Sequence, residues 1–209
     1  RYHSQVLQQI PVYQDAELQA YVQRSGDSLS KKSHRPNLFY RFTVLDSPDI
    51  NAFALPGGYI YINRGLMAYL SSEEELAAVL GHEIGHVTAR HSVRQYSQSQ
   101  ILGILSAAIE MNQGRSAGNL ANLASGALLS GYGREMELEA DEFSGFIMYH
   151  LGATLEQAQS AVKLLSNNND DSRSTHPSRH KRFAAIEKGY NKARSNSSKK
   201  EVYTKNNSS

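Results

Sequence analysis

Two histidines, His82 and His86, stand four residues apart in the segment GHEIGHVTARHS, and Glu83 directly follows the first of them. On an α-helix this spacing places both imidazoles on one face, where they can bind one metal ion. Glu83 would lie beside the metal, close enough to take a proton from metal-bound water without being a ligand. The alternative is a chance match, because isolated H-E-x-x-H segments occur without a metal. A third ligand would decide between these interpretations.

The sequence contains no cysteine, so the third ligand must be His, Asp or Glu. The segment GREMELEADEFSG, residues 133–145, offers several acids on a predicted helix. Glu137 and Asp141 share a face with small residues, against which another helix can pack. We predict Glu137 as the third ligand and Asp141 as the carboxylate that accepts the outer N–H of a metal-bound histidine. Glu135, Glu139 and Glu142 fall on a different, like-charged face, which is predicted to lie in water. The alternative is that the whole acidic helix is solvated.

The histidine segment is predicted to lie on a helix that begins near Ser71, where a Ser cap precedes three glutamates, and runs to about Tyr96. Gly81 and Gly85 would let a neighbouring element approach this helix closely. His91 falls on its apolar side and is predicted to be structural. The apolar stripe that faces the core is expected to contain Leu76, Leu80, Ile84 and Val87.

Residues 39–65 form the one clearly β-rich region, with alternating aromatic and β-branched residues. They predict a three-stranded meander with a turn at Pro56-Gly57. Further helices are expected at residues 13–29, 134–151, 154–165 and 178–194, with one or two more between 101 and 133. The predicted fold class is therefore α+β: a mostly helical domain with a small sheet of about three strands before the H-E-x-x-H helix.

Length and composition indicate one globular domain, residues 1–194, followed by a polar tail, residues 195–209, that is predicted to be disordered. The net charge of +2 is too small to indicate a nucleic-acid partner. The longest apolar segments are too short for a membrane span. The sequence begins at Arg1 rather than Met, so we allow for an upstream lipid anchor or additional domain.

Four segments in the same order resemble the zinc metallopeptidases that include HtpX, BepA, the mitochondrial Oma-type proteases and the CAAX prenyl endopeptidases. The resemblance covers residues 39–187. It is carried by NAFALPGGYIYINRGL (51–66), EEELAAVLGHEIGHVTARHS (73–92), GREMELEADEFS (133–144) and STHPSRHKRFAAI (174–186). It implies a zincin-like (gluzincin) fold, one Zn²⁺ per chain and, from the E-x-x-A-D pattern, the same roles for Glu137 and Asp141.

The family's T-H-P segment, with an arginine six residues after the histidine, is matched at His176 and Arg182. The resemblance implies that His176 is either a regulatory fourth ligand or a stabiliser of the oxyanion, with Arg182 or Arg134 as weaker candidates for the oxyanion or substrate contact. From the residues alone, a histidine before proline is usually an exposed loop residue, and Arg182 is usually structural.

In such enzymes the substrate commonly lies extended along a sheet edge, and the segment that resembles this edge is Asn51, Ala52, Phe53, Ala54 and Leu55. The resemblance thus implies a zinc-dependent endopeptidase acting on extended or unfolded polypeptides, with Glu83 as general base. Because no membrane helix is visible, the periplasmic BepA-like branch fits best, which implies the bacterial periplasm or cell envelope. Two alternatives remain: a self-inhibited zinc protein that acts as chaperone or adaptor, with His176 blocking the water position, and a structural helical domain whose motif is accidental.

Overall fold

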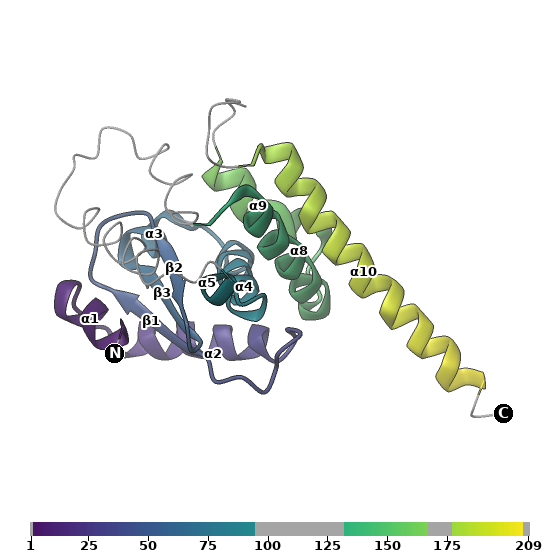
Figure 1. Ribbon diagram of the computed structural model, residues 1–209, viewed down its shortest axis with the longest axis horizontal. Helices are drawn as coiled ribbons and strands as arrows, with labels where there is room; N and C mark the ends of the chain where they lie inside the picture. The colour runs from purple at the N-terminus through teal and green to yellow at the C-terminus, as the bar shows by residue number, and fades with distance from the viewer. Residues whose placement is uncertain (1, 95–131, 167–176, 207–209) are drawn as a thin grey trace.

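The computed structural model describes residues 2–94, 132–166 and 177–206, and Figure 1 shows how its elements are arranged. It combines a small three-stranded sheet with a majority of helices, which confirms the predicted α+β class. The helices expected between residues 101 and 131 lie outside the described residues, as does His176. The described helices are α1 (Tyr2–Gln9), α2 (Ala16–Ser30), α3 (Arg64–Tyr69), α4 (Glu73–Thr88), α5 (His91–Arg94), α8 (Arg134–Leu151), α9 (Leu155–Leu165) and α10 (Arg179–Asn206).

The strands are β1 (Arg41–Leu45), β2 (Ala52–Leu55) and β3 (Tyr59–Asn63), in the order β1-β3-β2. β2 and β3 form an antiparallel hairpin, whereas β1 pairs with β3 in parallel. The predicted meander is therefore wrong in one connection. Only the turn at Gly57 and Gly58, with φ of 92° and 84°, closes a hairpin. The segment from residue 46 to 51 instead leads from β1 on one side of β3 to β2 on the other side. Gly65 N–H donates a hydrogen bond to Ser47 O, which holds this segment against the start of α3.

The helix α4 lies between the sheet and the three helices α8, α9 and α10 (Figure 1). The side chain of Ser72 caps α4 by accepting from the backbone N–H of Glu75, as the sequence predicts. Of the four predicted core positions, Leu76, Leu80 and Ile84 are buried, and Val87 is partly buried against the same core. Through these side chains, α4, which carries His82 and His86, is packed into the main core.

The outer edge of β1 is covered by two glutamines of α2. The side-chain amide of Gln19 accepts from Val44 N–H and donates to Val44 O, both at 2.9 Å. Gln23 accepts from Phe42 N–H and donates to Tyr40 O. These side chains make the hydrogen bonds that a neighbouring strand would otherwise make, so this edge is closed to another strand.

The strand β2 lies at the opposite edge and is buried on both faces. Ala52 and Ala54 belong to the main core, whereas Phe53 and Leu55 pack into a second cluster with Val6 and Ile10 of the N-terminal segment. The sequence pattern did not predict helix α1, which packs against this face of the sheet.

Two helix boundaries differ from the sequence prediction. α4 ends at Thr88 rather than near Tyr96, because Arg90 adopts a left-handed conformation with φ of 56° and α5 begins at His91. α10 continues to Asn206, so residues 195–206 are helical where composition predicted disorder. Extending an existing helix fixes only one residue for each hydrogen bond gained, so even a polar segment can prolong it. Within the described residues, no helix combines the length and the apolar character that crossing a bilayer requires.

Candidate metal centre

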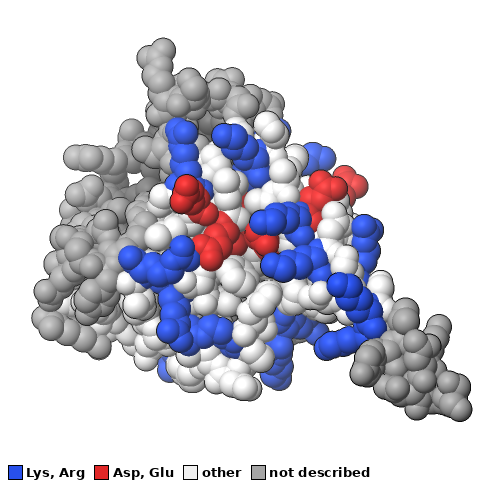
Figure 2. Space-filling view, turned by 45° about the vertical axis from the view of Figure 1, so that its right-hand side comes forward, with Lys and Arg blue, Asp and Glu red and all other residues white. Residues whose placement is uncertain are grey.

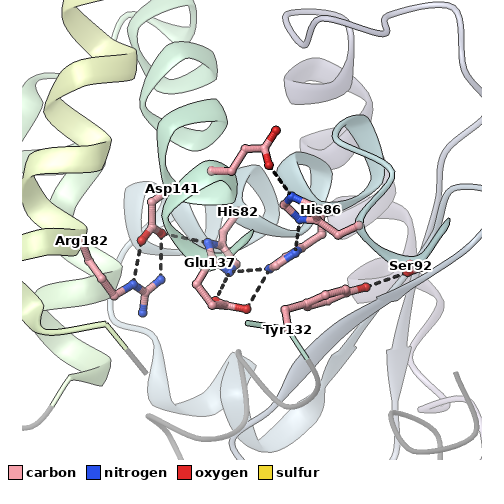
Figure 3. Close-up of polar contacts among 9 residues, drawn as sticks. His82, His86, Ser92, Tyr132, Glu137, Asp141 and Arg182 are labelled. Atoms are coloured by element: carbon pink, nitrogen blue, oxygen red, sulfur yellow. Dashed lines mark hydrogen bonds and ion pairs between the residues drawn. The ribbon is translucent and has the colours of Figure 1, made fainter. Parts of the chain in front are cut away.

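His82 and His86 point from α4 toward Glu137 of α8, and one ligand atom from each lies within 4.8 Å of the others (Figure 3). All three side chains are buried. The helices approach closely at Gly85, where an added Cβ would lie 2.7 Å from the carbonyl oxygen of Ala140. The glycine in the motif is therefore what lets α8 bring its glutamate to the two histidines.

The distances among the three groups fit a small metal ion. Glu137 Oε2 lies 3.3 Å from His82 Nε2, and Glu137 Oε1 lies 3.4 Å from His86 Nε2. Ligands 2.0–2.1 Å from a tetrahedral metal are separated by about 3.3 Å. The two Nε2 atoms are somewhat closer, at 2.9 Å. These three residues would hold the ion.

The electrostatics of the site also favour a cation. Both oxygens of Glu137 are buried, and neither accepts a hydrogen bond within the described residues. Burial opposes a charge on His82, but Asp141 and Glu137 outweigh it and raise the pKa of His82 to about 10. Burial and the positive charge of His82 hold the pKa of His86 well below its usual value. Without a metal, one proton on His82 supplies the positive charge that the site favours.

Asp141, the carboxylate expected to support His82, lies beside its ring, and an arginine lies on the other side of that carboxylate. Asp141 Oδ1 lies 2.9 Å from His82 Nδ1. Arg182 donates from Nε and Nη2 to the two oxygens of Asp141, both at 2.8 Å. Burial opposes the charge on Asp141, but Arg182 and His82 outweigh it and lower the pKa of this carboxyl. Nδ1–H of His82 therefore has a carboxylate to donate to, which leaves Nε2 free for a metal.

Glu83 is buried at the site, and its Oε1 has no hydrogen-bond partner among the residues that the structure describes. Burial raises the pKa of the Glu83 carboxyl to about 8. A carboxyl with a pKa near neutral can both accept and return a proton, as a general base must do in hydrolysis.

The other predicted residues have different positions. Arg182 lies behind Asp141 as seen from His82 (Figure 3), which makes it a partner of Asp141 rather than a contact of the ligand atoms. Arg134 is exposed at the first position of α8. His176 is outside the described residues. Four of the five residues predicted as a substrate edge form β2, and Asn51 precedes it.

The surroundings of His86 differ from the sequence prediction at His91 and Glu139, and they include Tyr132, which the sequence analysis did not single out. His91 was predicted to lie on the apolar side of a continuous helix, but the break at Arg90 places its Nδ1 2.8 Å from His86 Nδ1. The ring of Tyr132 stacks on His86 with centroids 4.1 Å apart. Glu139, predicted to face only water, lies 3.0 Å from His91 Nε2. Nothing in the local pattern signals these contacts, since they depend on the helix break and on the approach of α8.

An H-E-x-x-H helix whose histidines meet a glutamate from a second helix, beside a small sheet, defines a metallopeptidase domain. The profile of Peptidase family M48 matches residues 16–189. The chain belongs to Peptidase family M48.

Individual relatives agree with this assignment. The mitochondrial metalloendopeptidase OMA1 of Arabidopsis thaliana is 30% identical over 171 residues, covering 78% of this chain and 35% of that protein. The beta-barrel assembly-enhancing protease of Yersinia pestis is 35% identical over 104 residues, covering 50% and 21%. The metalloprotease YcaL of Escherichia coli is 30% identical over 130 residues, covering 60% and 51%. The chain therefore matches only about a fifth to a half of the length of these relatives.

Proposed function

We propose that this domain is a zinc-dependent endopeptidase that hydrolyses peptide bonds in extended or unfolded polypeptides. The observation that carries the proposal is the meeting of His82, His86 and Glu137 within 4.8 Å, with the buried Glu83 next to His82 in the motif. Two imidazoles and one carboxylate are a ligand set of catalytic zinc, which keeps a further position for water. Membership of Peptidase family M48 supports the same class of reaction.

Zinc at this site would supply an acidified water and polarise the scissile carbonyl. Glu83 accepts the proton of the attacking water and then delivers it to the leaving amine. Asp141 and Arg182 keep His82 oriented throughout. His176 is the proposed donor to the oxyanion or an inhibitory fourth ligand, and Arg134 is a second candidate for the oxyanion contact.

The substrate is proposed to lie extended along the outer edge of β2. Two observations support this position: the edge of β1 is already occupied by Gln19 and Gln23, and β2 packs against α4, which carries the motif. Pairing through backbone hydrogen bonds would give little sequence selectivity, as an enzyme for unfolded chains requires.

We further propose a location in the bacterial periplasm or cell envelope, where misfolded envelope proteins would be the substrates. The support is the similarity to the beta-barrel assembly-enhancing protease of Yersinia pestis. Fractionation of cells that express the full-length gene product at native level would show the protein in the periplasmic or membrane fraction. Recovery in the cytosolic fraction would contradict this location.

The test of the activity is casein hydrolysis by the zinc-loaded chain, with bound zinc quantified in each sample. Glu83→Gln should keep its zinc and lose at least about a hundredfold in rate, because the general base is removed. The exposed Glu156→Gln is the matched control and should retain the parent rate. Inactivity of the parent despite full zinc loading, with activity only in His176→Ala, would indicate a self-inhibited protease. Inactivity of every zinc-loaded variant would reject the peptidase in favour of a chaperone or adaptor.

A further inference from the structure

A chain of polar contacts leads from the second metal-site histidine to the protein surface. His86 Nδ1 lies 2.8 Å from His91 Nδ1, and His91 Nε2 lies 3.0 Å from Glu139 Oε2. Arg94 Nη1 donates to the same Glu139 oxygen at 2.6 Å. The His91 side chain is fully buried, whereas the side chain of Glu139 is 38% exposed. Except for Glu139, which belongs to α8, these residues lie on α4 and α5.

Only one arrangement of protons satisfies this chain together with a metal at His86 Nε2. The His86 proton must then sit on Nδ1, which makes His91 Nδ1 the acceptor. His91 accordingly carries its proton on Nε2 and donates it to the Glu139 carboxylate. In the reverse arrangement, His86 would carry its proton on Nε2, facing Glu137, and His91 would turn a lone pair toward a carboxylate. The negative charge of Glu139, held by Arg94, opposes that reverse arrangement.

The backbone is built to bring His91 to this position. Arg90 holds a φ of 56°, a left-handed conformation that costs a non-glycine residue about 1 kcal/mol or more. This turn ends α4 and directs the His91 ring back to His86, where a continuous helix would carry it away. The stacked ring of Tyr132, whose hydroxyl lies 2.7 Å from Ser92 Oγ, closes the other side of His86.

We propose that His91 is a positioning residue for the metal: it accepts the Nδ1–H of His86, donates to Glu139, and so fixes His86 with its Nε2 lone pair toward the metal. The chain His86–His91–Glu139–Arg94 then parallels the chain His82–Asp141–Arg182 on the other ligand. α8 supplies the supporting carboxylate in both. This inference rests on the proposed metal site.

The experiment measures zinc affinity by competition with a chromogenic chelator and the absorption spectrum of the Co²⁺-substituted chain. His91→Phe keeps the ring volume but removes the acceptor, and should weaken zinc binding by about 10- to 100-fold and alter the Co²⁺ bands. His91→Asn restores an acceptor oxygen near the position of Nδ1 and should recover most of the affinity. Glu139→Leu should weaken binding to an intermediate degree, and the exposed His180→Phe, on α10, serves as control.

Thermal unfolding of each metal-free variant separates loss of the fold from loss of the metal. Parent-like zinc affinity in His91→Phe would overturn the inference, as would an equal loss in His91→Phe and His91→Asn. If His91→Phe does not fold, His91→Asn and Glu139→Leu decide: parent-like affinity in Glu139→Leu then overturns the proton arrangement. A parent chain that binds no zinc would refute the metal site itself, which distinguishes that failure from failure of the role of His91.

Discussion

Glu83, Glu137 and Asp141 are three buried carboxyls whose surroundings give them different chemistry. Burial raises the pKa of Glu83 and of Glu137, and for both carboxyls it outweighs the opposing effect of the nearby charge of His82. Asp141 is as deeply buried, but the guanidinium of Arg182 keeps it charged. A metal or a proton can therefore change the charge state of Glu83 and Glu137, whereas Asp141 is held as a carboxylate beside His82 Nδ1.

Glu83→Gln should change the pH dependence of stability in the metal-free chain. The pKa of Glu83 is raised from 4.5 to about 8 on folding, so above pH 4.5 the unfolded state loses its proton first and the parent loses stability as pH rises. The free energy of unfolding of Glu83→Gln, relative to the parent, should rise between pH 4.5 and 8 by about 3 to 5 kcal/mol and then level off. Urea unfolding at several pH values measures this. Parallel curves for the two chains would contradict the raised pKa.

Asp141→Asn should destabilise the fold strongly, because it leaves the buried charge of Arg182 without its partner. The expected loss is about 3–5 kcal/mol near pH 7. The pKa of Asp141 is depressed below 3.8 on folding, so its contribution is complete above that value and declines as pH falls further. The difference between parent and variant in urea unfolding should thus be constant above about pH 5 and shrink below about pH 4.

Asp46→Asn is the matched control for that experiment. Asp46 pairs with Arg64 on the surface, where the two side chains are 44% and 39% exposed. Its loss should cost less than about 1 kcal/mol. Equal costs for the two substitutions would show that burial of the Asp141 pair carries no special weight.

At the scale of elements, the site depends on the contact between α4 and α8. Alternating positions of α8 carry Glu137, which faces the two motif histidines, Glu139, which contacts His91, and Asp141, which contacts His82. A shift of this one helix would disturb all three contacts. Gly85 sets the distance between the helices, since the Ala140 backbone occupies the space a side chain would need. The motif's glycine is therefore as much a part of the site as its histidines.

Gly85→Ala should separate α4 from α8. A Cβ there would lie 2.7 Å from Ala140 O and 3.0 Å from Ala140 Cα, and backbone cannot yield as a side chain can. We expect a loss of about 1–3 kcal/mol in unfolding free energy and weaker zinc binding than in the parent. Gly133→Ala, where an added Cβ meets nothing within 4 Å, should keep the parent affinity. Unchanged zinc affinity in Gly85→Ala would show that the helix spacing does not control the site.

At the scale of the whole molecule, a single described body carries the site, and α10 extends from it (Figure 1). Figure 2 shows Lys and Arg side chains spread over the described part of one face, around a smaller group of acidic side chains. One ion pair between opposite charges joins α8 to α10: Glu142 Oε2 lies 2.7 Å from Lys188 Nζ. The presence of both signs on this face agrees with the small net charge of +2.

A chain that ends at Arg194 should fold and bind zinc like the parent. Residues 195–200 of α10 are almost all exposed, and Ala193 is the last buried side chain in the described part of α10. The loss in unfolding free energy should stay below about 1 kcal/mol. A chain that ends at Ser178 should fail to fold, because it lacks the buried Arg182 and Ile186. Failure of the longer variant would contradict the proposed domain boundary at residue 194.

The sequence by itself determined what depends on neighbours within a few turns. The spacing of His82 and His86, the Ser72 cap and the apolar stripe of α4 are local patterns, and the structure has each of them as predicted. The face of α8 that carries Glu137 and Asp141 follows from helical periodicity in the same way.

The tertiary structure alone decided what depends on contacts between distant segments. The parallel pairing of β1 with β3, the meeting of Arg182 with Asp141 and of Glu139 with His91 join residues that no periodicity relates. The helix break at Arg90 is a local feature, but no glycine or proline lies near Arg90 in the sequence to predict it. The physical reason is that a left-handed turn at a non-glycine residue persists only when surrounding contacts compensate its cost, and those contacts come from α8 and Tyr132.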